Sequence, residues 1–146
     1  MAKYLFFIGY RRVETGGEAA RIRYHLSKRF AAARIFKDSH LLTAGPGGAT
    51  REALAETRIY LALIGPNWSL LLEEDKRDRI KNHMTFELEI ALASPSVTVV
   101  PVLIGGAAMP VPSMLPSEIA ALAALAPCVL RADPAFRDDL DALVDA

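Results

Sequence analysis

The chain has a single cysteine among its 146 residues, and this scarcity limits its chemistry. The one thiol, Cys128 in the apolar setting APCVL, cannot form an intrachain disulfide and is expected to be a plain buried thiol. The three histidines are scattered, without carboxylates at ligand spacing, and make no metal site. The sequence therefore favours a reducing compartment and gives no metal framework.

Excess charge and long apolar runs are also missing. The 17 basic and 17 acidic residues balance, so no net field draws the chain to nucleic acid or to an acidic membrane. No segment reaches the roughly 18 apolar residues of a membrane span. The apolar run near the N-terminus is too short for a secretion signal, and no small-residue cleavage site follows it. We expect a cytoplasmic protein.

The length is that of one domain, with 52% hydrophobic and 23% charged residues, as in globular proteins. Residues 1–146 are therefore interpreted as a single domain. Because the chain stops directly after a helical pattern, it could be the N-terminal part of a longer multidomain protein.

Short apolar runs without polar alternation are separated by helical patterns along the chain. Such runs are typical of parallel strands covered on both faces by helices. The expected strands are 4–8, 34–38, 59–65, 97–104 and 128–132. The expected helices are 17–30, 50–58, 84–93, 117–125 and 133–146, with no firm assignment for 69–82. The pattern predicts an α/β, flavodoxin-like three-layer fold with a five-stranded parallel sheet in the order 2-1-3-4-5.

Three local features carry expectations of their own. Thr50 is expected near a helix N-cap, and Asp133 is expected to cap the last helix with Pro134 in its first turn. Pro101 has no backbone N–H to donate in a central strand, so a bulge or distortion is expected there.

A ligand in this fold class binds beyond the carboxyl ends of the strands, where the strand order reverses. Gly9–Arg12 follow the first strand and Gly65–Trp68 follow the third, so these two loops are expected to frame the site. The helix that carries Glu87 comes after the third strand and can border the same cleft.

Two glutamates stand two residues apart in the stretch NHMTFELEIALA. Glu87 and Glu89 point about 160° apart on a helix. Apolar residues flank Glu87, whereas Glu89 shares its face with Thr85 and Ala93, which we expect to be the solvent side. A carboxylate in the position of Glu87 is either paired or lines a cleft.

These segments together resemble a bacterial Toll/interleukin-receptor (TIR) domain. FFIGYRRVET is similar to the family's opening box, and RIFKD with LLTAGPGG is similar to its second strand and BB loop. The family's third strand and its exit resemble YLALIGPNW. Its helix with the catalytic glutamate is similar to FELEIALA, and its fourth strand with the proline-rich exit is similar to VVPVLIGGAAMPVPSMLP. The five boxes occur in order over nearly the whole chain.

The resemblance implies cleavage of NAD⁺ with release of nicotinamide, because many bacterial members of the family hydrolyse or cyclise NAD⁺. NAD⁺ is then the substrate, and no cofactor is implied. The alignment places the catalytic glutamate on Glu87 and puts His83 where the family often has an aromatic residue. Gly9 replaces the usual serine, and Asn82 stands where aspartate is common. A role in immune defence, self-association into an oligomer or filament and a fused or associated sensor domain are also implied.

Further contacts are assigned by residue type around this cleft. Gly9 allows close backbone approach, and Tyr10 and Trp68 could stack on the nicotinamide or adenine, although Trp68 equally suits core packing. Arg11 and Arg12 could pair with the pyrophosphate, with surface ion pairs as the alternative. The remaining substrate-binding candidates are Phe36, Asp38, Gly45 and His83. The GPGG stretch lacks the Lys-Ser/Thr of a P-loop and is better interpreted as a loop that gates the cleft or docks a neighbour.

Other functions remain open or are excluded at this stage. A non-catalytic TIR scaffold would keep the same fold and act by homotypic association. A nucleoside deoxyribosyltransferase also uses a glutamate in a comparable fold, but the Gly-Tyr-Arg-Arg opening favours a TIR domain. A phosphoacceptor response regulator needs acidic residues after the first strand and an aspartate at the end of the third, and neither is present.

Overall fold

A computed structural model describes residues 4–37, 48–78 and 83–145 of the chain. Its strands are β1 (Tyr4–Gly9), β2 (Ile35–Lys37), β3 (Thr57–Ile64), β4 (Thr98–Ile104) and β5 (Cys128–Leu130). Its α-helices are α1 (Arg12–Ser27), α2 (Gly48–Ala55), α3 (Trp68–Arg77), α4 (His83–Ala93) and α5 (Phe136–Asp145). Short 3₁₀ segments are η1 (Ala32–Arg34), η3 (Pro112–Met114) and η4 (Ser117–Ala124).

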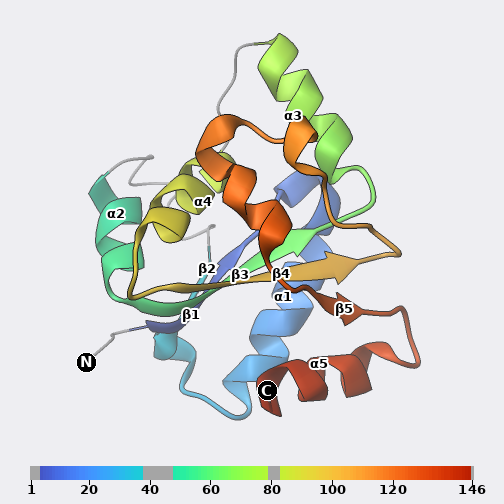
Figure 1. Cartoon of the computed structure of the whole chain (residues 1–146). Coiled ribbons are helices and arrows are strands. Elements are labelled where there is room, and N and C mark those ends of the chain that lie inside the picture. The colour runs from blue at the N-terminus through green and yellow to red at the C-terminus, as the bar shows by residue number, and fades with distance from the viewer. Residues whose placement is uncertain (1–3, 38–47, 79–82, 146) are drawn as a thin grey trace.

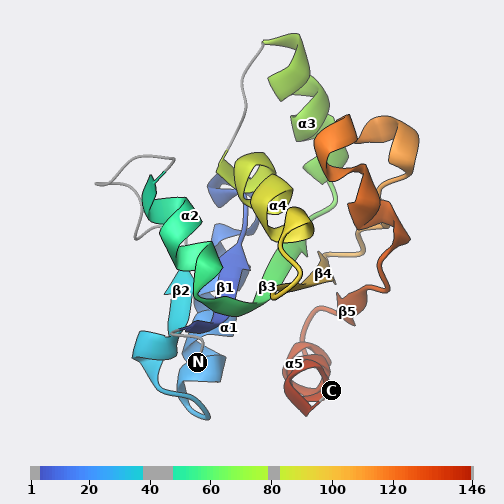
Figure 2. The same cartoon turned by 60° about the vertical axis from the view of Figure 1, so that its left-hand side comes forward.

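All strand pairs are parallel, and the sheet order is β2-β1-β3-β4-β5 (Figure 1). Helices α1 and α5 cover one face, and α2, α4 and η4 cover the other (Figure 2). Burial on both faces is the physical reason for the unalternating apolar strands. The flavodoxin-like class, the five parallel strands and their order are thereby confirmed.

Successive residues of β3 supply two separate cores. Tyr60, Ala62 and Ile64 face the core under α2 and α4, while Leu61 and Leu63 face the core under α1 and α5. This alternation follows from the pleat of a strand, which sends neighbouring side chains to opposite faces. A residue's place in β3 therefore decides whether it can contact α4, and Tyr60 is on that side.

The local expectations at Pro101 and Asp133 are wrong. Helix α2 begins at Gly48, so Thr50 lies in its first turn, near the N-cap as expected, but is not the capping residue itself. The pairing of β3 with β4 continues one-to-one through Ala62 and Pro101, so there is no bulge. The β4–β5 pairing starts only at Val102, which leaves Pro101 outside the ladder on that side.

Asp133 binds Arg21 on α1 instead of capping the last helix. The two side chains form an exposed ion pair of 2.7 Å, and α5 begins only at Phe136. The hydrogen bond from Arg21 lowers the pKa of Asp133. In the first turn of α5, Asp139 accepts hydrogen bonds from the side chain and the backbone N–H of Arg131. These hydrogen bonds lower the pKa of Asp139 to about 2.

The segment without a sequence assignment contains a helix, α3, for residues 68–77. Cys128 is half-buried on β5, and its partial burial raises the pKa of the thiol. Across the ranges that the structure describes, no helix is long and apolar enough to cross a membrane.

Candidate functional site

Glu87 is buried in the middle of α4, with 1% of its surface exposed. Met84, Leu88 and Ala91 of the same helix pack into the core over β3. The first turn of α4 is held by Trp68, whose indole Nε1 donates to Met84 Sδ at 3.2 Å. The apolar face thus brings Glu87 down toward the sheet, while Glu89 remains partly exposed.

Tyr60, which is fully buried near the centre of β3, is a hydrogen-bond partner of the Glu87 carboxylate. The Tyr60 hydroxyl donates to Glu87 Oε1 at 2.7 Å, and both side chains are buried. The Tyr60 ring also packs against the Phe7 ring of β1, with centroids 5.3 Å apart. Glu87 is therefore a hydrogen-bonded carboxylate in largely apolar surroundings.

Gly9, the last residue of β1, makes room for this arrangement. A Cβ atom at Gly9 would overlap the Tyr60 hydroxyl oxygen and the adjacent ring carbon. The hydroxyl therefore lies against the carboxyl end of β1 and holds Glu87 at that edge of the sheet. The space that we expected Gly9 to offer to a ligand is occupied here by Tyr60.

The loops after β1 and β3 are joined to each other across the point where the strand order reverses. Glu14 Oε2 accepts a hydrogen bond of 2.5 Å from the backbone N–H of Asn67, at the start of α3. A Cβ atom at Gly65 would lie 2.5 Å from Glu14 Cδ, so the carboxylate passes directly over this glycine. The two loops are therefore adjacent, and Glu14 connects them.

Arg11 pairs with Asp75 of α3 through a 2.6 Å contact between Nη1 and Oδ2, with side chains 11% and 15% exposed. The guanidinium that was assigned to pyrophosphate is thus bound to a carboxylate. The pair fastens α3 to the β1–α1 turn.

Replacing Asp75 with asparagine is expected to lower the free energy of unfolding by about 1–3 kcal/mol, because Arg11 keeps its partly buried charge without a counter-charge. Urea denaturation measures the change. Asp133→Asn is the matched control, since its pair with Arg21 is 46% and 66% exposed and contributes much less. Equal losses in the two variants would contradict this account.

Two aromatic candidates are in the protein core. Tyr10 packs with the core under α1 and α5, on the opposite face of the sheet from Glu87, and is 5% exposed. Trp68 is 1% exposed and belongs to the core under α4. Neither ring is exposed to a ligand in this structure. Trp68 packs in the core, which was the alternative to stacking on the substrate.

The other candidates differ in how they can be placed. Arg12 is the first residue of α1, and Phe36 pairs with Phe7 in the middle of the short β2 strand. His83 is the first residue of α4, one turn before Glu87, and is half-buried. Asp38 and Gly45, together with Asn82, lie outside the described residues.

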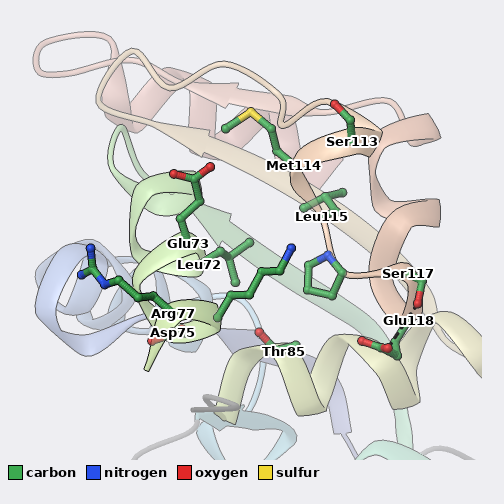
Figure 3. Close-up of a pocket in the computed structure, with 12 residues that line it drawn as sticks. Leu72, Glu73, Asp75, Arg77, Thr85, Ser113, Met114, Leu115, Ser117 and Glu118 are labelled. Carbon is green, nitrogen blue, oxygen red and sulfur yellow. Dashed lines mark hydrogen bonds between the residues drawn. The ribbon is translucent and has the colours of Figure 1, made fainter. Parts of the chain in front are cut away.

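A cavity of about 860 Å³ lies on the other side of α4, between α3 and the 113–118 segment (Figure 3). Thr85 lines it together with Leu72 and Leu115, and Glu87 is not among its lining residues. Thr85 is 5% exposed, so its expected place on the solvent side is wrong. Within residues 4–37, 48–78 and 83–145, no group of three or more His, Cys, Asp or Glu side chains could hold a metal ion.

Sequence reasoning missed Tyr60 and Glu14. The signal for Tyr60 was a lone hydroxyl-bearing residue in the apolar strand IYLALIG, because a buried tyrosine hydroxyl needs a partner. Glu14 carried no comparable signal, since an acidic residue in the first turn of a helix is common.

The sequence matches no family model and no curated protein. Among solved structures, the chain is similar to the TIR domains of the activated Roq1 resistosome, which directly recognises the pathogen effector XopQ. The identity is 15% and the TM-score 0.66, with 97% of this chain and 98% of that chain covered. It is also similar to a metazoan TIR-STING receptor from C. gigas in complex with 2′,3′-cGAMP, at 20% identity and a TM-score of 0.49, covering 96% of this chain and 39% of that one.

The parallel sheet and its two helical layers define a flavodoxin-like protein. More particularly, the chain has the fold of a TIR domain, as the near-complete mutual coverage with the Roq1 domains shows.

Proposed function

We propose that the chain cleaves the nicotinamide–ribose bond of NAD⁺, as a glycohydrolase or a cyclase, with Glu87 as the catalytic carboxylate. The observation that supports this most is the carboxylate itself, which is buried in apolar surroundings at the carboxyl edge of the sheet. The sequence resemblance assigns the catalytic glutamate to this same residue.

One carboxylate is sufficient for this reaction. The C1′–N bond breaks and its electron pair stays on the nicotinamide nitrogen, so a cationic pyridinium leaves as a neutral pyridine without protonation. Positive charge develops on the ribose, as in glycoside hydrolysis, and the Glu87 anion stabilises it. Water then attacks C1′ and loses a proton, giving ADP-ribose, or an adenine nitrogen attacks and gives a cyclic product.

Substrate access is the step that this resting structure restricts. Because Glu87 is 1% exposed, the ribose can reach it only after the surrounding chain rearranges. We propose that self-association drives this change and that a neighbouring copy completes the site. The similar Roq1 domains come from an activated resistosome, which supports assembly as the trigger. A fused or associated sensor domain would initiate it, in a role in immune defence.

Nicotinamide release per protein molecule is therefore expected to rise steeply with protein concentration. The measurement is incubation of the purified chain with NAD⁺ at several concentrations, with the products resolved by chromatography. A constant rate per molecule would contradict activation by assembly. The absence of nicotinamide at every concentration, including assembled protein verified by light scattering, would contradict the proposed activity.

The second candidate is a non-catalytic scaffold that acts by homotypic association. Val13 in the first turn of α1 is 82% exposed, and Leu70 in the first turn of α3 is 54% exposed. The Glu14–Asn67 bond joins these two turns, so the two exposed apolar residues belong to neighbouring turns. Assembly without nicotinamide release would favour this candidate.

A further inference from the structure

The hydrogen bond between Tyr60 and Glu87 connects the sheet to the proposed catalytic group. Tyr60 comes from β3 and Glu87 from α4, 27 residues later, and their contact of 2.7 Å is fully buried. We propose that Tyr60 is a positioning residue that holds the Glu87 carboxylate in one orientation and in its charged form. The proposal rests on the proposed function and deepens it.

The chemistry requires such a partner. Burial in apolar surroundings favours the neutral form of a carboxyl group, whereas a hydrogen bond donated to the carboxylate favours the charged form. Stabilising positive charge on the ribose needs the anion. A hydroxyl donor inside the core offsets the effect of burial without adding a competing positive charge.

The tyrosine is fixed by its own surroundings. The Tyr60 side chain is 0% exposed, and its ring packs on Phe7. Its hydroxyl lies at the end of β1, in space that a Cβ atom at position 9 would fill. Gly9 and Tyr60 therefore act together, so that the glycine in the opening box serves the catalytic carboxylate through the tyrosine.

Other ionisable groups on the elements packed around Glu87 are less suited to this task. In the described part of the chain none of them is buried, and all are exposed or half-buried: Tyr4, Arg51, Glu52, Arg58, Glu74, Asp75, Glu118, His83 and Glu89. Arg51 is directed to the Phe86 ring, with its guanidinium carbon 5.4 Å from the centroid.

Replacing Tyr60 with phenylalanine provides the test, because it removes the hydroxyl and keeps the ring. We expect the acid limb of the pH profile for nicotinamide release to move upward by about one to two pH units, the equivalent of a hydrogen bond to a charged group. Above that limb, kcat should return to within about threefold of the unmodified chain. A merely structural role would instead lower the rate equally at every pH.

Tyr24→Phe is the matched control, since it removes a hydroxyl from a tyrosine that is 65% exposed on α1. Its pH profile is expected to match that of the unmodified chain. A Tyr60→Phe profile with an unmoved acid limb would overturn the proposal.

A second measurement separates this proposal from the proposed function. In protein labelled with ¹³C at glutamate Cδ, the Glu87 signal is identified by its loss in Glu87→Gln, and its titration is followed by NMR. The midpoint should be higher in Tyr60→Phe by the same one to two units. Equal midpoints would overturn the role of Tyr60 even if the chain is active. A shifted midpoint without any nicotinamide release would leave the tyrosine's effect standing and reject the NAD⁺ reaction.

Discussion

Glu87→Gln is expected to lower nicotinamide release by about a thousandfold or more at every protein concentration. Glutamine has nearly the same shape as glutamate, and its amide oxygen can accept the hydrogen bond from the Tyr60 hydroxyl, so the fold should persist. What is lost is the negative charge that is proposed to stabilise the ribose, in surroundings where a low dielectric strengthens its effect. Loss of one well-placed electrostatic contact in an enclosed site lowers rates by about 10²–10³, and loss of a full charge should reach at least the upper end.

Glu89→Gln is the control for this experiment. It makes the same change two residues further along α4, at a side chain that is only half-buried, and activity should remain near that of the unmodified chain. Thermal denaturation of both variants shows whether they remain folded. If the Glu87 variant is folded and equally active, the carboxylate has been chosen wrongly, and if the two variants lose activity equally, the helix is being perturbed as a whole.

The strands and their order could be predicted because their physical signal is local. Four to eight apolar residues in succession, such as those of β3, indicate burial on both faces, and the parallel crossovers then restrict the order. Helix α3 gave no such signal, because charged residues are mixed with leucines and only Trp68 and Leu72 are buried. Leu70 is 54% exposed, which blurs any helical period.

The separation of Glu87 from Glu89 followed correctly from helix geometry, since Glu87 is buried and Glu89 is not. The same reasoning failed at Thr85, because it assumed that α4 has one packed face. Segment 113–118 and α3 enclose its other side, and Thr85 faces the cavity between them. The second neighbour buries Thr85 although His83 and Phe86 in the same turn remain half-buried, and sequence periodicity cannot reveal that neighbour.

The residues around the carboxylate were predicted less well, because their partners are distant in sequence. Arg11 was assigned to a phosphate, yet its partner Asp75 lies 64 residues away in a helix that the pattern did not reveal. Tyr10 follows β1 directly, and the direction of its side chain depends on the turn. Glycine at position 9 indicated close approach correctly, but the group that approaches is a side chain of the neighbouring strand.

Gly9→Ala is expected to destabilise the protein by about 3 kcal/mol, the upper end of the usual effect of overpacking. The new methyl group would overlap the hydroxyl of Tyr60, whose side chain is 0% exposed. Moving the ring would also take the hydroxyl away from Glu87 and leave a buried carboxylate with one donor fewer. Urea denaturation gives the free energy, and loss of nicotinamide release should accompany it.

Gly17→Ala is the matched control for that change, since no atom lies within 4 Å of its Cβ position on α1. Here alanine should stabilise the chain by about 0.5–1 kcal/mol, because it limits the unfolded backbone and suits a helix. The variant Tyr60→Leu removes the obstructing ring, so Gly9→Ala should cost less in that background, with a coupling energy of about 1–3 kcal/mol. Strictly additive effects would mean that the overlap between Gly9 and Tyr60 is not what requires glycine at this position, and the link from the opening box to the carboxylate would be lost.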